Sequence, residues 1–148
     1  MKYKNYTEMQ KEHQKQYDEF QKGRIFYAYS DEQFNEGMKS IGLKENETHK
    51  IYRLFGGVYI LRSESKAYHK LADDMDKEQK EHMQDLEFAK SAFKEELSNH
   101  EYIYTYELDD TLAALGLTTD EVNKSPILKK ALLEARKEYL KWYEEHDW

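Results

Sequence analysis

Apolar side chains recur at spacings of three and four along much of the chain, a pattern that predicts amphipathic helices. The first such stretch covers 5–22, and the last begins at Pro126, because proline is favoured at the first position of a helix. Between them the pattern predicts a long helical region from Ser63 or Ser65 to Leu97, either as one helix or as two that meet at a bend. Shorter helices are predicted between Ser30 and Gly42, at 110–115 and after Thr118.

Segments rich in β-branched and aromatic residues lie between these helices and predict strands. They are 24–29, 51–55, 58–62 and 101–106. Gly56 and Gly57 separate the middle two, and glycine tolerates the positive φ that a two-residue hairpin turn requires. We therefore expect an α+β fold, in which a small antiparallel sheet of about four strands packs against several helices, with long central and C-terminal helices.

The register of the predicted hairpin decides which of its residues face the core. If Phe55 pairs with Val58, alternate residues along each strand share a face. Arg53 and Arg62 then lie on a mixed, partly solvated face. The opposite face is fully apolar and should be buried, and it consists of Tyr52, Leu54, Tyr59 and Leu61.

One sequence unit occurs twice in the chain, at 26–43 and again at 103–117. Each copy reads as an aromatic strand, an acidic helix start and a Gly-Leu stop. The repetition favours a single domain over residues 1–148 with paired halves. The acidic pairs 31–32 and 109–110 could form a split carboxylate site, but their place at helix N-termini favours a structural role.

Composition and charge restrict the function classes. The chain of 148 residues carries 30 acidic side chains against 23 lysines and arginines, for a net charge of −7. This balance makes nucleic acid an unfavourable partner. Aromatic residues make up 14% of the chain and favour a folded core despite 36% charged residues. The lack of cysteine, of an apolar run of about 20 residues and of an apolar N-terminal segment predicts a cytoplasmic protein without disulfides or membrane spans.

Three polar residues, Asn99, His100 and Glu101, stand where a predicted helix ends and a predicted strand begins. Such junctions often line pockets, and histidine titrates near neutral pH. With Arg53 of the hairpin they form a candidate site for a small ligand or an enzymatic reaction. The alternative is structural, with Asn99 capping the helix and His100 satisfying a backbone carbonyl. No motif predicts a catalytic residue, and no cofactor is expected.

The predicted central helical region is densely acidic and offers a second candidate site. Its carboxylates could compete for a basic nucleic-acid-binding groove on a partner protein. The candidates are Asp73, Asp74, Asp76, Glu78, Glu81 and Asp85. His69 and His82 stand four residues from acidic neighbours, but an exposed charged face explains that spacing better than a metal site does.

Exposed aromatic residues leave two further alternatives open. Tyrosines of the predicted strands could stack on a single-stranded nucleic acid beside Arg53 and Arg62, although core packing is the preferred interpretation in so acidic a chain. The C-terminal region carries Trp142, Tyr143 and Trp148. Docking of these rings onto the chain's own domain is preferred over a contact in a homodimer.

Blocks of sequence between Tyr6 and Leu133 form a recognisable set. They are 26–30, 33–34, 36–38, 51–53, Gly57, 99–102, 110–112 and 114–117. Together these blocks resemble a family of small uncharacterised proteins of low-GC Gram-positive bacteria, their phages and mobile elements. The resemblance implies a phage or mobile-element setting in the bacterial cytoplasm, and it brings no activity and no catalytic residue with it. We therefore expect a non-enzymatic interaction protein, in concrete form an inhibitor of a host or bacterial defence protein.

Overall fold

The structure, a computed structural model, describes residues 2–146, so Trp148 lies outside the described residues. The chain divides into two compact units. The sheet unit is Glu12–Asp76, and the helical unit combines the described residues up to Lys11 with those from Lys77 onward. The expectation of a single domain stays a prediction.

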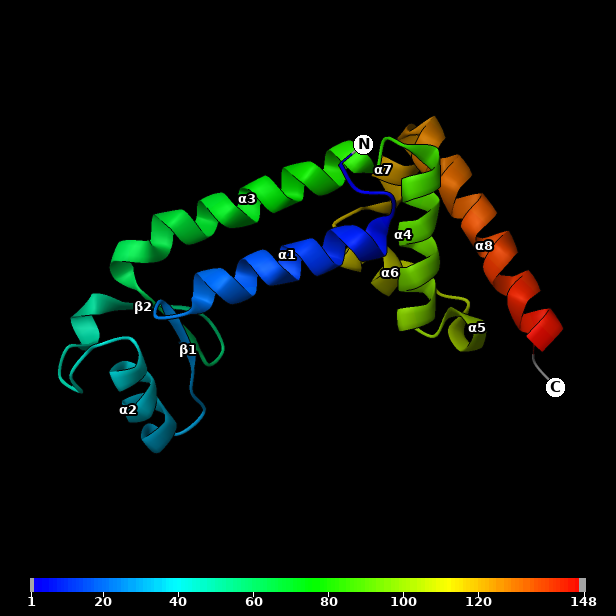
Figure 1. The fold of residues 1–148 in the computed structure, drawn as a ribbon. Coiled ribbons are helices and arrows are strands. Elements are labelled where there is room, and N and C mark those ends of the chain that lie inside the picture. Colours follow the sequence, from blue (N-terminus) through cyan, green and yellow to red (C-terminus); the bar gives the residue numbers. More distant parts are fainter. Residues whose placement is uncertain (1, 147–148) are drawn as a thin grey trace. The chain divides into compact units, whose positions relative to one another are not determined.

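Helices dominate the fold, and the strands lie in the sheet unit (Figure 1). In chain order the elements are α1 (Tyr6–Gln21), β1 (Ile25–Tyr27), α2 (Asp31–Ser40), the 3-10 turn η1 (Thr48–Lys50), β2 (Ile51–Phe55), β3 (Val58–Leu61), the 3-10 turn η2 (Arg62–Glu64), α3 (Ser65–His82), α4 (Leu86–Asn99), α5 (Tyr102–Thr105), α6 (Asp109–Ala114), α7 (Thr119–Lys124) and α8 (Pro126–His146). The predicted mixture of long helices and a small antiparallel sheet is confirmed.

The long central helical region consists of two helices, α3 and α4. The chain leaves the first after His82 and starts the second at Leu86. Asp85 caps the new helix, because its carboxylate accepts a hydrogen bond from the Phe88 amide at 2.9 Å. Its negative charge also complements the positive end of the helix dipole. Of the two predicted alternatives, the structure has the pair of helices.

Residues 101–106, which the sequence predicts as a strand, contain the short helix α5. Glu101 adopts left-handed backbone with φ of 54°, and its carbonyl accepts a hydrogen bond from the Tyr104 amide. Tyr102 turns into the core and is 1% exposed, whereas Tyr104 and Tyr106 stay exposed. Burial of one large ring outweighs the β propensity of this aromatic segment. The described residues therefore hold three strands rather than four, and the second copy of the repeated unit lacks its strand.

The three strands form an antiparallel sheet in the order β1-β3-β2. Phe55 lies opposite Val58, but Arg53 lies opposite Tyr59. The extra residue between the two pairs, Leu54, is a β-bulge. A bulge shifts the alternation of the strand by one residue, so the part of β2 before it faces the opposite way from the prediction.

The predicted apolar face of the hairpin is therefore wrong. That face combined Tyr52, Leu54, Tyr59 and Leu61. Tyr52 instead lies opposite Ile60 and is 44% exposed, whereas Ile60 is fully buried. Since Ile60 and Tyr59 point to opposite faces of β3, Tyr52 and Tyr59 are on opposite faces of the sheet.

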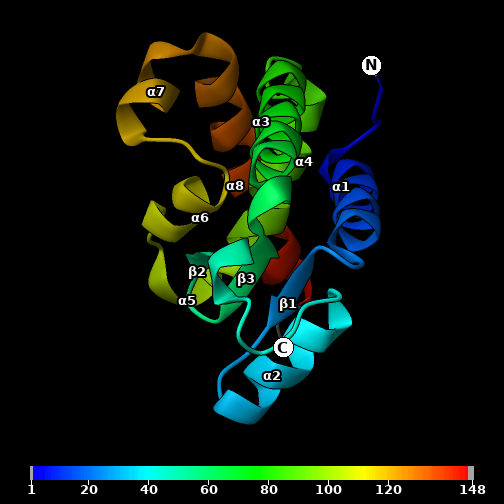
Figure 2. The ribbon, with the colours of Figure 1, turned by 90° about the vertical axis from the view of Figure 1, so that its left-hand side faces the viewer.

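Both faces of the sheet are covered within the sheet unit, which is why β3 is apolar at every position. Helix α2 lies beside β1 (Figure 2) and covers one face. The cluster on that face consists of Phe26, Ala28, Met38, Ile41 and Ile51, with Phe34, Leu43, Tyr59 and Leu61 at its margin. The cluster on the other face consists of Ile25, Val58 and Ile60, with Tyr17, Phe20, Leu54 and Tyr68 at its margin.

Gly37 lets helix α2 approach the sheet closely. A Cβ atom at this position would lie 2.0 Å from Cδ2 of Phe26. The Phe26 ring cannot yield, because it is 5% exposed and is held between the rings of Phe34 and Tyr59 at 5.5 and 5.2 Å. Glycine in the middle of this helix is therefore a packing requirement.

Replacing Gly37 with alanine is expected to lower the free energy of unfolding by about 1–3 kcal/mol through overpacking. The sign is informative, because alanine in an unobstructed helix would instead raise stability by about 1 kcal/mol. Urea unfolding followed by circular dichroism measures the change. Lys39→Ala, at an exposed position of the same helix, is the matched control and should be close to neutral. A stabilised Gly37→Ala variant would contradict the packing found here.

The core of the helical unit lies between α4 and α8, which run side by side (Figure 1). Small residues on both helices are fully buried and allow close approach: Ala89 and Ala92 on α4, Ala131 and Ala135 on α8. Phe93 and Leu97 fill the remaining space. The apolar stripe predicted for the last helix is buried as far as Tyr139, but Trp142 is 53% exposed.

Candidate functional site

Glu96 is a buried carboxylate on α4, 5% exposed. Its Oε1 accepts a hydrogen bond from the Tyr6 hydroxyl at 2.9 Å and lies 3.4 Å from Nδ2 of Asn99. Its Oε2 lies 3.2 Å from Nε2 of His100. A carboxylate is tolerated in a protein interior when its oxygens have hydrogen-bond partners. Both oxygens of Glu96 have them, so the four residues form one polar network.

Tyr6 fixes the start of α1 to α4 within the helical unit. Its amide donates to the Ser91 hydroxyl at 3.1 Å, in addition to the bond from its own hydroxyl to Glu96. Burial raises the pKa of the Tyr6 phenol well above its usual value, and the hydrogen bond to Glu96 raises it further. The hydroxyl therefore stays protonated and keeps its role as the donor to Glu96.

The structure places the three junction candidates at the end of α4, and two of them contact Glu96. Asn99 is the last residue of the helix, and His100 follows it with both its ring and its amide bonded to Glu96. Glu101 is exposed and is the N-cap residue of α5. This geometry supports a structural role for Asn99 and His100, while a binding role for the three residues stays a prediction.

The two arginine candidates, Arg53 and Arg62, belong to the sheet unit. Arg53 lies on β2 and is exposed. The Arg62 guanidinium donates to the carbonyls of His49 and Ile51 at 3.0 and 3.2 Å, so it ties η1 and the first residue of β2 to η2. A site that joins Arg53 to Asn99–Glu101 stays a prediction, since the two sets belong to different units.

The acidic candidates on α3 and at the start of α4 have varied surroundings. Asp74 pairs with Lys70 at 2.8 Å, and Asp85 caps α4. Asp73, Asp76 and Glu81 are exposed. Glu78 contacts Lys2 and Tyr3. At least three of the six carboxylates thus take part in internal contacts.

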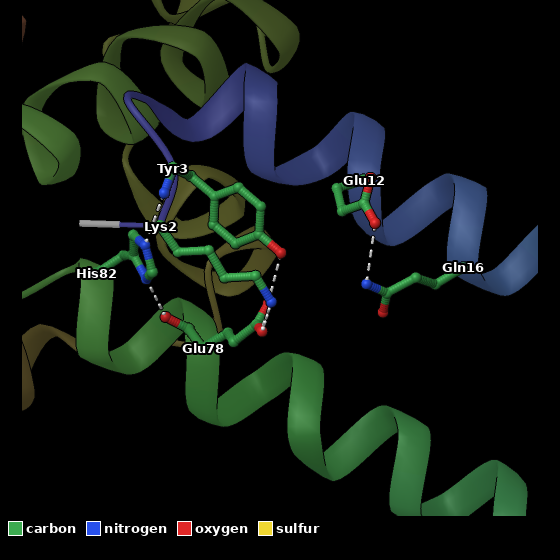
Figure 3. A network of polar contacts seen from close by, with 6 residues as sticks. All are labelled: Lys2, Tyr3, Glu12, Gln16, Glu78 and His82. Atoms are coloured by element: carbon green, nitrogen blue, oxygen red, sulfur yellow. Dashed lines mark hydrogen bonds and ion pairs between the residues drawn. The ribbon is translucent and has the colours of Figure 1, made fainter.

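The segment before α1 is bound to the end of α3, both within the helical unit (Figure 3). The carboxylate of Glu78 accepts from the Tyr3 hydroxyl and pairs with Nζ of Lys2, each at 2.9 Å. The Tyr3 amide donates to Nε2 of the buried His82 at 3.2 Å, and Nδ1 of His82 lies 2.8 Å from the Glu78 carbonyl. Because Nε2 accepts, the proton of the neutral ring is on Nδ1. His82 therefore anchors a chain segment, and its buried position is at odds with the solvated face that the sequence predicts.

A groove of about 540 Å³ lies between α4 and the last turns of α8. Its lining residues are Lys94, Ser98, Glu138, Tyr139, Lys141, Trp142, Tyr143 and Glu145. Burial raises the pKa of Tyr139 to about 12, and its hydroxyl accepts a hydrogen bond from the Ile103 amide at 3.2 Å. Tyr139 thus joins the floor of the groove to α5.

Six aromatic rings form a continuous series from α5 to the end of α8, which we call the aromatic ladder. In order they are Tyr106, Tyr102, Tyr139, Tyr143, Trp142 and His146, with successive centroids 5.6, 6.0, 4.8, 5.0 and 4.3 Å apart. The middle of the ladder is buried, whereas Tyr106 and Trp142 are 63% and 53% exposed. Tyr104, 78% exposed, extends this surface on α5. Large rings held rigidly at a surface are typical of protein-binding sites.

A sequence profile described as a family of unknown function, DUF7659, matches residues 5–138. The chain belongs to the DUF7659 family. This confirms the resemblance to an uncharacterised family, whereas the bacterial and phage setting stays a prediction. Neither a curated protein nor a solved structure matches this DUF7659 chain.

Residues 2–146 of this DUF7659 protein contain neither a candidate metal site nor a candidate membrane-spanning helix. Within that range no three histidine, cysteine or acidic side chains are grouped so that they could bind a metal ion. None of the helices described has the length and apolar character needed to cross a bilayer.

Most of the residues that line the groove between α4 and α8 were not predicted as site residues from the sequence. The prediction singled out the end of α4, but the lining there comes from Lys94 and Ser98 rather than from Asn99 or His100. The available signal was the aromatic C-terminal region. Tyr143 packs against the core of the helical unit, whereas Trp142 remains half exposed, and the preference for docking over a homodimer contact stays a prediction.

Proposed function

We propose that this DUF7659 protein is a non-enzymatic interaction protein that binds another protein through the aromatic ladder of its helical unit. One observation carries the proposal: the half-exposed ring of Trp142 lines a groove of about 540 Å³, and the rings of Tyr104 and Tyr106, at the other end of the ladder, are also exposed. Exposed tryptophan and tyrosine dominate the binding energy of many protein interfaces. If the protein bound no partner, a chain this polar would be expected to bury these large rings.

The charges around the groove suit a protein surface better than a phosphate-rich polymer. Lys94 and Lys141 are balanced by Glu138 and Glu145, and Glu138 is also 3.2 Å from Lys90. A nucleic-acid groove would carry an excess of positive charge. The polar groups near the end of α4 are bonded to one another around Glu96, which favours a structural role over catalysis.

The setting of this interaction rests on the sequence alone. The resemblance and the acidic composition support a phage or mobile-element protein that inhibits a host or defence protein in the bacterial cytoplasm. The acidic residues of α3 would then add electrostatic steering toward a basic partner. The aromatic ladder remains the surface that decides affinity in this proposal.

The proposal is tested by comparing three immobilised proteins in lysate of the source organism. They are the wild type, a Tyr104→Ala/Trp142→Ala variant, and a Leu133→Ala variant as matched control. Leu133 is 50% exposed on α8 but does not line the groove. We expect a saturable partner that the wild type and Leu133→Ala retain and the ladder variant loses, with affinity reduced at least about tenfold. Equal recovery by all three proteins would overturn the proposal.

A further inference from the structure

Strand β1 is an open edge of the sheet. The sheet order β1-β3-β2 gives it a neighbour on one side, and no other strand of the described chain pairs with it. The Leu61 amide donates to the Arg24 carbonyl at 2.9 Å, and the Ala28 amide donates to the Gly57 carbonyl at 2.8 Å. In an antiparallel pair, hydrogen-bonded residues alternate with residues that are not bonded. The backbone amides and carbonyls of Arg24, Phe26 and Ala28 therefore point toward β3.

It follows that the amides and carbonyls of Ile25 and Tyr27 point away from the sheet. Over residues 2–146 no hydrogen-bond partner is found for these four backbone groups outside the sheet. Ile25 is largely covered, but Tyr27 is 47% exposed and Tyr29 is 79% exposed. The Tyr29 amide, next in the alternation, donates to Oε1 of Gln33 at 2.7 Å. A side-chain oxygen already occupies the place that the carbonyl of a neighbouring strand would take.

A groove lies at this edge, between β1 and α2. Its volume is about 520 Å³, and its lining residues are Phe26, Tyr27, Tyr29, Gln33, Glu36, Gly37 and Ser40. Gly37 packs directly against the Phe26 ring, so no side chain of α2 stands between these two lining residues. Glu36 is exposed and is the one charged side chain among the lining residues. An occupant with a lysine or arginine would thus complement the groove.

The opposite edge, β2, is blunted in ways that β1 is not. The bulge at Leu54 interrupts its regular spacing, and the Ile51 carbonyl accepts a bond from Arg62. Bulges and charged residues are the common means by which proteins protect sheet edges. The sequence of β1, Ile25–Tyr27, contains no proline, charge or bulge. An edge strand with outward amides and carbonyls beside a groove is the arrangement used for binding by strand addition.

We propose that the groove between β1 and α2 binds an extended peptide segment of a partner protein, which adds to β1 as a further strand and places a basic side chain beside Glu36. The backbone of Tyr27 supplies the central pair of hydrogen bonds. Alternate side chains of the segment enter the groove over Phe26 and Gly37. This site lies in the sheet unit and does not depend on the aromatic ladder.

The test uses the full chain and a displayed library of random octapeptides. Enriched peptides are synthesised and titrated into isotope-labelled protein, with the backbone amides followed by NMR. We expect alternating apolar residues with lysine or arginine, and the largest shifts at the amides of Ile25 and Tyr27. An otherwise identical peptide with glutamate at the basic position should bind about fivefold more weakly. Enriched peptides that leave both amides unshifted would overturn the proposal.

Two variants separate backbone pairing from side-chain contact. Tyr27→Pro removes the outward donor and is tolerated at an edge, because that amide makes no bond to β3. Tyr27→Thr removes the ring but keeps the donor. We expect Tyr27→Pro to weaken binding about tenfold relative to Tyr27→Thr, the equivalent of one backbone hydrogen bond. Circular dichroism verifies that both variants fold, and a peptide N-methylated at the paired residue repeats the test on the wild type. Equal affinity in both comparisons, or concentration-dependent pairing of two copies through β1 in place of peptide binding, counts against the proposal.

Discussion

Replacing Tyr102 with alanine should lower the free energy of unfolding of the helical unit by about 3–5 kcal/mol. Tyr102 is 1% exposed, and its ring contacts those of Tyr106 and Tyr139 at 5.6 and 6.0 Å. Its hydroxyl accepts a hydrogen bond from Nε of Arg136 at 2.9 Å, and the guanidinium also lies 5.6 Å from the ring centroid. Alanine would leave a cavity at the middle of the aromatic ladder and a partly buried arginine without its acceptor.

The measurement is urea unfolding followed by tryptophan fluorescence, because Trp142 lies in the same unit on α8. Tyr102→Phe is the matched control, since it keeps the ring and removes only the hydroxyl. It should cost about 1 kcal/mol, the net value of one hydrogen bond. A Tyr102→Ala variant as stable as Tyr102→Phe would show that the ring is not the anchor of α5.

Replacing Glu96 with alanine is expected to lower the free energy of unfolding by about 2–3 kcal/mol. The buried hydroxyl of Tyr6 would lose its acceptor, and a buried polar group without a partner costs about 1–3 kcal/mol. The loss of the contact to His100 adds less, because the His100 side chain is 32% exposed and can be solvated.

Two further variants identify the origin of this effect. Glu96→Gln retains an oxygen that can accept from Tyr6 and should cost only about 1 kcal/mol. A double-mutant cycle of Tyr6→Phe with Glu96→Ala should give a coupling energy of about 1 kcal/mol, as expected for residues in direct contact. If Glu96→Ala leaves stability unchanged, Glu96 is not a structural carboxylate, and the alternative of an enzyme or ligand site at the end of α4 would gain support.

The helices could be predicted from the sequence because their signals are local. The apolar stripes of α4 and α8, the cap at Ser30 and the proline that opens α8 each act within a few residues. The predictions that were wrong concern features that depend on tertiary contacts. The bulge at Leu54 reverses which face the side chains of β2 before it point to, and no residue in that segment predicts a bulge. Residues 101–106 have strand composition, yet the burial of Tyr102 determines their structure.

The candidate sites were harder to predict than the fold for a related reason. The candidates taken from the sequence were polar residues that could carry chemistry, among them Asn99 and His100. These residues satisfy the buried carboxylate of Glu96, a demand that is visible only once Glu96 is known to be buried. Both grooves instead include aromatic or small residues, such as Trp142 and Gly37, whose exposure the sequence does not encode locally.

The division of the chain has a consequence for the order of folding. The sheet unit, Glu12–Asp76, interrupts the helical unit in sequence, so the helical unit is completed by contacts between distant segments. The bond from Tyr6 to Glu96 joins residues 90 positions apart, and that from Tyr3 to His82 joins residues 79 positions apart. Closing such long loops costs entropy before any contact offsets it, which slows folding. Docking of the first turn of α1 is therefore expected late, after α4 and α8 have packed, and the sheet unit behaves kinetically as an insertion that must be synthesised before its host can close.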